Sequence, residues 1–240
     1  MRSFRKVASL DVPWGVDALD KVLMDPLLRA AARLSSQLGL GDRLRLVGGL
    51  AVRLQVGSGA RVTGDVDLVA MDSAAREAVL RHLAWSGFTV GEMVGWWRAV
   101  RGGKDALIVD VSPHPVVDVS TFDSIALHGE PQCVAVGGSP VWVVERNDLA
   151  LLKVLACRGQ DLVDLVLLSA HAPPDAAEMA RRAALEDLER AVARGANRAR
   201  HALRTGDLAE VFEESMGRGL DATEREAAAR LLGALEAKGL

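Results

Sequence analysis

Apolar and polar residues follow two different patterns along the chain, and the change falls at Glu145. Before it, helical and extended patterns alternate. Helical spacing of apolar residues predicts a helix over residues 15–39, interrupted near Pro26, and another over residues 73–87 with Ser73 as its N-cap. Shorter apolar runs predict strands over residues 44–47, 61–69, 88–100 and 106–112, a hairpin turn at 101–104, and short extended stretches over 133–144.

After Glu145 the pattern is wholly helical. Asn147 or Asp148 is the expected cap of one helix, and another is expected around Gln160. Three more helices are predicted over residues 175–240. In the first of these, one face carries Leu185, Leu188, Val192, Ala199 and Leu203, and the opposite face carries Arg190, Arg194, Arg198, His201 and Arg204. This basic stripe is either a solvated face or a track for a phosphate backbone.

The strand predicted over residues 61–69 presents two carboxylates on one face. Alternation directs Val62, Gly64, Val66 and Leu68 toward a core, and Arg61, Thr63, Asp65 and Asp67 to the other side. Adjacent carboxylates repel each other, which raises the pKa of one of them unless a cation lies between them. Hard oxygen ligands at this spacing suit Mg²⁺ or Mn²⁺. We therefore interpret Asp65 and Asp67 as a divalent-metal pair, in preference to two solvated acids at a strand end.

A glycine pair, Gly48 and Gly49, lies between the strand predicted at 44–47 and a helix expected to begin at Leu50. In a strand, glycine turn and helix of this kind, backbone N–H groups and the helix N-terminus face an anion. Most Gly-Gly pairs are ordinary turns. The position of this pair before the acidic strand favours phosphate binding.

A third carboxylate is expected from a later strand. Leu107, Val109 and Val111 form one face of the strand at 106–112, so Asp110 lies on the other. If this strand lies beside the acidic strand, Asp110 completes a cluster able to hold two metal ions about 4 Å apart. Asp118 is the alternative. Asp110 is favoured because Pro113 and Pro115 make the stretch around Asp118 a poor central strand.

Composition narrows the class of protein. The 240 residues suffice for one large or two small domains, half are apolar and a quarter are charged, and the net charge of −3 provides no overall attraction to nucleic acid or an anionic membrane. Cys133 and Cys157 lack the spacing of a zinc site and suit a reducing compartment. No apolar run reaches the roughly 18 residues of a membrane span. We expect a cytoplasmic protein with no membrane partner.

A second group of charged residues follows in an otherwise apolar helical region: Lys153, Arg158, Asp161 and Asp164. Together with the glycine pair, the acidic strand and Asp110, this group resembles the nucleotidyltransferase superfamily of DNA polymerase beta and kanamycin nucleotidyltransferase. The branch that it is most similar to is that of abortive-infection (AbiEii-like) toxin nucleotidyltransferases of type IV toxin–antitoxin pairs. The resemblance covers roughly residues 40–170.

The resemblance implies an α/β (α+β) fold, with a mixed nucleotidyltransferase sheet flanked by helices in a core over residues 1–145. A helical C-terminal domain over residues 146–240 would close over the nucleotide. It implies transfer of a nucleoside monophosphate from a nucleoside triphosphate to a hydroxyl group, with release of pyrophosphate. The acceptor would be tRNA or another RNA, and the protein partner a cognate antitoxin.

The resemblance also implies roles for individual residues. Asp65, Asp67 and Asp110 would bind Mg²⁺ or Mn²⁺, with Asp110 also activating the attacking hydroxyl. Lys153 would be a catalytic contact to the triphosphate. The residues expected around the nucleotide are Gly48, Gly49, Arg61, Thr63, Lys153, Arg158 and Asp161. Two alternatives stay open: nucleotidylation of a small molecule or a protein, and a module that binds a nucleotide without turnover.

Overall fold

A mixed sheet is the platform on which the polar residues above are arranged. The computed structural model describes residues 25–103, 106–118 and 121–238, and within them seven strands form one sheet in the order β3-β4-β5-β2-β1-β9-β8. β2 runs parallel to β5 and β1 parallel to β9, and the remaining neighbours are antiparallel. The strands are β1 (Leu44–Leu46), β2 (Asp65–Ala70), β3 (Thr89–Glu92), β4 (Trp97–Arg101), β5 (Leu107–Pro113), β8 (Gln132–Val136) and β9 (Ser139–Val143). β6 (Val116–Val117) and β7 (Ser124–Ile125) pair separately.

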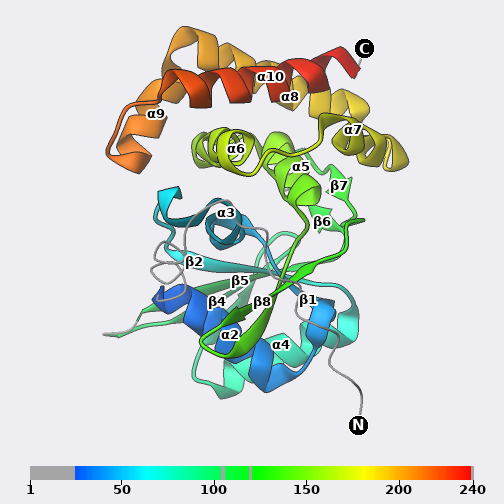
Figure 1. Ribbon diagram of the computed structural model, residues 1–240. Coiled ribbons are helices and arrows are strands. Elements are labelled where there is room, and N and C mark those ends of the chain that lie inside the picture. The colour runs from blue at the N-terminus through cyan, green and yellow to red at the C-terminus, as the bar shows by residue number, and fades with distance from the viewer. Residues whose placement is uncertain (1–24, 104–105, 119–120, 239–240) are drawn as a thin grey trace.

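Helices cover both faces of this sheet. Figure 1 shows α2 and α4 on one side, α3 on the other, and the later helices gathered beyond α3. Their bounds are α2 (Pro26–Leu38), α3 (Gly48–Val56), α4 (Ser73–Trp85), α5 (Arg146–Ala156), α6 (Gly159–His171), α7 (Ala176–Leu185), α8 (Glu189–Thr205), α9 (Asp207–Met216) and α10 (Ala222–Lys238). None of the helices in the described residues is long and apolar enough to cross a membrane.

The two faces of β2 and β5 have different surroundings. Val66 and Val109 line a cavity of about 270 Å³ together with Leu34 of α2 and Leu83 of α4. Side chains one residue away along these strands point to the opposite face, toward α3. The alternation expected for Val66 and Leu68 is confirmed, since both are buried. It is wrong for Val62, which is 81% exposed, and for Gly64, which is also exposed, because the strand begins only at Asp65.

Four helix starts differ in detail from the sequence prediction, and one of them is that of α3, which begins at Gly48 and not at Leu50. α2 begins at Pro26, where the Asp25 carboxylate accepts hydrogen bonds from the Leu27 and Leu28 N–H groups, and the expected turns before Asp25 lie outside the described residues. α4 is capped by Asp72 and not by Ser73. α5 is capped by Glu145, whose carboxylate accepts from the Asn147 N–H. For α4 and α5 the capping carboxylate lies one and two residues before the first residue that the pattern indicated as a cap.

The single strand predicted over residues 88–100 is wrong. The structure has a hairpin of β3 and β4, in which Gly95 adopts a φ of 80° and the Met93 N–H donates to the Trp96 carbonyl at 2.8 Å. A positive φ is readily adopted by glycine and turns the chain back on itself. Trp97 packs partly against the core, while Trp96 lies in the turn. Lys104, expected in the next turn, lies outside the described residues.

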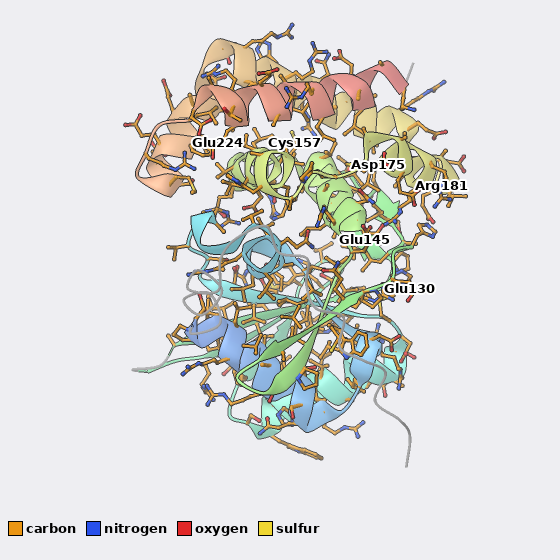
Figure 2. All side chains as sticks on the ribbon, in the orientation of Figure 1. Glu130, Glu145, Cys157, Asp175, Arg181 and Glu224 are labelled. Carbon is orange, nitrogen blue, oxygen red and sulfur yellow. The ribbon has the colours of Figure 1, made fainter. Side chains whose placement is uncertain are left out.

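The described part of the tail contains four helices, α7 to α10, and not the three predicted. The break falls at Asp187, which has a φ of 55°, so Leu185 belongs to α7 and is 57% exposed. The remaining apolar face of α8 is buried as expected. α8 packs closely on α5 at Gly195, where an added Cβ would lie 2.2 Å from the Val154 carbonyl oxygen. The Cys157 thiol donates to the Gly195 carbonyl at the corner between α5 and α6 (Figure 2).

Candidate active site

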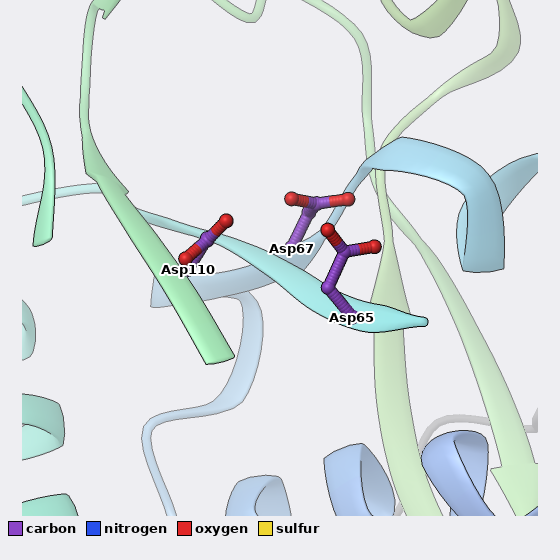
Figure 3. A group of neighbouring side chains, drawn as sticks. All are labelled: Asp65, Asp67 and Asp110. Carbon is purple, nitrogen blue, oxygen red and sulfur yellow. The ribbon is translucent and has the colours of Figure 1, made fainter. Parts of the chain in front are cut away.

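Three carboxylates meet on the α3-facing side of the sheet. The parallel register of β2 and β5 places Asp67 opposite Asp110, and oxygen atoms of Asp65, Asp67 and Asp110 all lie within 4.8 Å of one another (Figure 3). The strand adjacency on which the choice of Asp110 depended is therefore present. Asp118 lies after β6, where its carboxylate accepts from the Thr121 N–H at 3.2 Å.

Burial and repulsion between the carboxylates dominate the electrostatics of the cluster. Burial, followed by the charges of Asp65 and Asp110, raises the pKa of Asp67 from 3.8 to about 7, against the lowering effect of Lys153 and Arg158. A cation among the oxygens would remove this repulsion. Three carboxylates that offer oxygen atoms at this spacing are a donor set that fits Mg²⁺ or Mn²⁺.

The glycine pair is required by close contacts with the acidic strand. Gly48 begins α3 with a φ of 66°, and a Cβ there would lie 1.9 Å from Asp67 Oδ2. A Cβ on Gly49 would lie 3.1 Å from Arg61 Nη2 and from the Thr63 hydroxyl oxygen. The two glycines thus allow the first turn of α3 to lie directly over the side chains of Arg61, Thr63 and Asp67.

Thr63 and Arg61 make different connections from the same loop. The Thr63 hydroxyl donates to Asp65 Oδ1 at 2.9 Å, which orients that carboxylate. Arg61 is buried and donates from Nε and Nη2 to the two oxygens of Asp164, at 2.9 and 3.1 Å. Arg61 therefore ties the acidic strand to α6.

The basic residues expected from the sequence form a network with the helical acids. Lys153 Nζ lies 2.9 Å from Asp161 Oδ1 and 2.8 Å from Asp164 Oδ2. Burial would lower the pKa of Lys153, but the two carboxylates outweigh it and raise that pKa. Arg158 pairs with Asp161 at 2.7 Å, although its own side chain is 77% exposed. The network brings two cations into the field of Asp67.

Arg98 is a member of the site that the sequence patterns did not identify. It lies opposite Asp110 in the register of β4 and β5, and it donates from Nε to Asp110 Oδ1 at 2.9 Å and from Nη2 to Oδ2 at 2.7 Å. Its guanidinium also lies 4.9 Å from the centre of the Trp96 ring. The available signal was the predicted hairpin turn at 101–104, which makes the strand that contains Arg98 the partner of the Asp110 strand.

Comparison with solved structures identifies similar chains at low identity. JHP933 from Helicobacter pylori is 15% identical, with 93% of this chain and 94% of that chain covered and a TM-score of 0.49. An antigenic nucleotidyltransferase-like protein from Paracoccidioides brasiliensis is 16% identical, with 86% and 97% covered and a TM-score of 0.48. ANT(2")-Ia in complex with adenylyl-2"-tobramycin is 20% identical, with 56% and 75% covered and a TM-score of 0.39.

No curated protein matches the sequence. A family model does match, over residues 29–237, and its description is that of the nucleotidyl transferase AbiEii toxin of type IV toxin–antitoxin systems. This match extends over most of the chain, through the sheet, the carboxylate cluster and the helices that follow. The chain therefore belongs to the AbiEii family of nucleotidyltransferase toxins.

Proposed function

We propose that the protein transfers a nucleoside monophosphate from a nucleoside triphosphate to a hydroxyl group of an RNA, and that the reaction requires Mg²⁺ or Mn²⁺. The observation that carries the proposal is the convergence of Asp65, Asp67 and Asp110 within 4.8 Å on one face of a rigid sheet. In the reaction, the acceptor oxygen bonds to the α-phosphorus, and the bond between that phosphorus and the bridging oxygen breaks. Pyrophosphate leaves, and the hydroxyl proton passes to Asp110.

Asp65, Asp67 and Asp110 are the proposed ligands of the divalent ion. When bound, the ion would neutralise charge on the attacking and leaving oxygens and on the phosphates. Thr63 holds Asp65 by its hydroxyl hydrogen bond, and Gly48 leaves room for the Asp67 carboxylate. These contacts fix the ligand oxygens before a substrate arrives, which is where most of the catalytic gain in such reactions originates.

The triphosphate is proposed to lie between the N-terminus of α3 and the network around Lys153. No side-chain hydrogen bond caps α3 at Val47, so the first N–H groups of that helix, including those of Gly48 and Gly49, are suited to phosphate oxygens. An ammonium group has three N–H bonds, and Lys153 directs two of them at carboxylates. We assign the third, and the exposed guanidinium of Arg158, to the triphosphate.

Arg61 and Asp161 are proposed to act through other residues. The Arg61 guanidinium is engaged by Asp164, so its expected effect on nucleotide binding is indirect, through the position of the acidic strand. Asp161 holds both Lys153 and Arg158.

We further propose that the division expected at residue 145 is functional. The sheet before it supplies the three carboxylates, and the helices after it supply the cations Lys153 and Arg158.

The acceptor is proposed to bind along α8. Arg190, Arg194 and Arg198 are exposed on this helix. Arg198 lies near enough to Cys157 for its charge to lower the pKa of that thiol, against a larger increase caused by burial. Cys157 directly precedes Arg158, so the basic stripe reaches the corner beside the proposed triphosphate contacts. A phosphate backbone on this stripe would approach the site from the helical side.

The same family description provides the remaining proposals. We propose a cognate antitoxin as protein partner, because the family is that of type IV toxin–antitoxin systems. A cytoplasmic location would provide nucleoside triphosphates and RNA, and Cys133 and Cys157, both free, suit a reducing compartment.

The test is incubation of the purified protein with each α-labelled nucleoside triphosphate, Mn²⁺ or Mg²⁺, and total RNA, followed by separation of RNA, protein and small molecules. Label in RNA, lost in Asp67→Asn and retained in the exposed control Asp42→Asn, is the expected result. Label on protein or on a small molecule would overturn the proposed acceptor. Triphosphate binding without any transfer would instead identify a binding module.

A further inference from the structure

The Asp110 carboxylate has both of its oxygens engaged by a single side chain. Arg98 forms a two-pronged contact with it, at 2.9 and 2.7 Å, from the neighbouring strand of the sheet. A planar guanidinium matches a carboxylate edge to edge, so this contact fixes the plane of the carboxylate. The side chain of Asp110 is 12% exposed and that of Arg98 is 41% exposed. The pair therefore lies at the rim of the cluster, with Arg98 on the solvent side.

The charge of Arg98 acts on the whole cluster and not on Asp110 alone. The hydrogen bond to Asp110 is the main cause that raises the pKa of Arg98, and the charges of Asp65 and Asp67 contribute as well. The Trp96 ring, 4.9 Å from the guanidinium, holds the side chain over the hairpin by a cation–π contact. Arg98 thus places one positive charge in the field of three carboxylates.

We propose that Arg98 is a positioning residue of the metal site with two separable effects. Its planar fork holds Asp110 in the orientation needed for reaction, and its charge offsets one of the three negative charges, which weakens capture of a divalent ion. The proposal rests on the proposed metal site. Arg98 would thus lower the affinity of the cluster for the ion while it holds Asp110, the proposed proton acceptor, in the right orientation.

The experiment measures Mn²⁺ binding to the wild type, Arg98→Ala, Arg98→Lys and the control Arg101→Ala, together with label transfer at saturating Mn²⁺. Arg101 lies on the same strand, is exposed, and its guanidinium lies over Phe88 instead of the acids. Arg98→Ala should bind Mn²⁺ about three- to tenfold more tightly, because a repelling charge is gone. Arg98→Lys keeps that charge and should bind within about twofold of the wild type. Both Arg98 variants should transfer less label, and Arg101→Ala should match the wild type in both measurements.

Two further measurements make the outcome specific. The gain in Arg98→Ala should shrink as the ionic strength rises from about 0.01 M to about 1 M, because the Debye length falls from about 30 to about 3 Å. Arg98→Lys, which keeps the charge, should stay within about twofold of the wild type at both ionic strengths.

Each alternative result has a separate meaning. Unchanged or weaker Mn²⁺ binding in Arg98→Ala would overturn the charge effect. Full label transfer by Arg98→Ala or by Arg98→Lys would overturn the positioning effect. Absence of Mn²⁺ binding by the folded wild-type protein would overturn the metal site itself, and with it the proposed function, so the two failures are distinguishable.

Discussion

Asp67 is the residue on which the contacts of the site converge. Gly48 lies against its carboxylate, Asp110 lies opposite it in the sheet register, and the charges of Lys153 and Arg158 reach it from the helices. Burial and like charge nevertheless dominate and raise its pKa to about 7. In the metal-free protein, this carboxylate is therefore a local cost to stability at neutral pH.

The pH dependence of stability follows from that pKa. The folded pKa of Asp67 is raised, so the native state binds more protons than the unfolded state between the unfolded value of 3.8 and about 7. The contribution of Asp67 to the free energy of unfolding consequently falls as the pH rises through this window. Asp67→Asn should be more stable than the wild type above pH 7, by up to about 4 kcal/mol, and nearly equal to it near pH 4.

Urea unfolding in a metal chelator between about pH 4 and about pH 8 measures this difference. Asp42→Asn, at an exposed site on the other side of β1, is the control and should follow the wild-type curve. A difference between Asp67→Asn and the wild type that does not change with pH would contradict the expected titration.

Sequence reasoning at the residue scale identified the acids but not Arg98. Asp65 and Asp67 could be placed on the same face because side chains alternate along a strand, whichever strands lie beside it. The contact between Arg98 and Asp110 depends on the register of β4 and β5, and the predicted turn at 101–104 indicates that these strands pair but not which residues lie opposite each other. The pairing of Arg61 with Asp164 spans 103 positions and leaves no local signal.

At the scale of elements, the buried network joins β2 to α5 and α6. Arg61→Met would leave Asp164, which is fully buried, with only part of its compensation. Because an unpaired buried charge is costly, we expect the free energy of unfolding to fall by about 2–4 kcal/mol. Arg158→Met removes a partner of Asp161 that is itself mostly exposed, and should cost about 1 kcal/mol or less. Chemical denaturation of both variants tests the contrast, and equal losses would contradict it.

The packing of α8 on α5 makes a second prediction at this scale. Gly195→Ala places a methyl group 2.2 Å from the Val154 carbonyl oxygen, so the helices must separate. The expected loss is about 2–3 kcal/mol. Gly233→Ala is the matched control in α10, where an added Cβ meets nothing within 4 Å. That change should stabilise the protein by about 0.5–1 kcal/mol, because alanine is the better helix former. Thermal unfolding of the two variants should therefore shift in opposite directions.

Most elements were predictable, and the errors concern helix starts and two missed breaks, the turn between β3 and β4 and the break between α7 and α8. The strands containing Asp65 and Asp110 and the helices containing Lys153 and Asp161 follow from apolar periodicity. Asp72 and Glu145 cap their helices from one residue before Ser73 and two before Asn147, because their carboxylates accept from the Ala75 and Asn147 N–H groups. The break between α7 and α8 occurs at Asp187 with a positive φ, which apolar spacing does not reveal.

At the scale of the whole molecule, the basic stripe of α8 gives a prediction about the acceptor. Replacing Arg190, Arg194 and Arg198 with Gln should reduce label transfer to RNA severalfold, because three contacts to the phosphate backbone are lost. The three side chains are exposed, so the fold should be unaffected. The control replaces Arg33, Arg81 and Arg101, which are also exposed but lie on α2, α4 and β4. It removes the same charge and should preserve transfer. Equal effects of the two triple changes would mean that overall charge, and not α8, governs the acceptor.

The overall architecture could be predicted from the sequence only because the sequence resembles the nucleotidyltransferase superfamily. The mixed sheet with flanking helices agrees with that expectation. Local patterns could not provide the strand order, because β5 adds beside β2 and β9 beside β1 across long stretches of chain. The arrangement of the described helices beyond α3 likewise depends on contacts such as that of Gly195 with Val154.

Gly48 has a practical consequence for the genetics of a toxin. Gly48→Ala adds one methyl group against the Asp67 carboxylate and adds no charge, so it should silence the enzyme without changing its net charge. Cells should then tolerate expression of the silenced toxin alone. Growth arrest by a well-folded Gly48→Ala protein would show that the carboxylate can move aside.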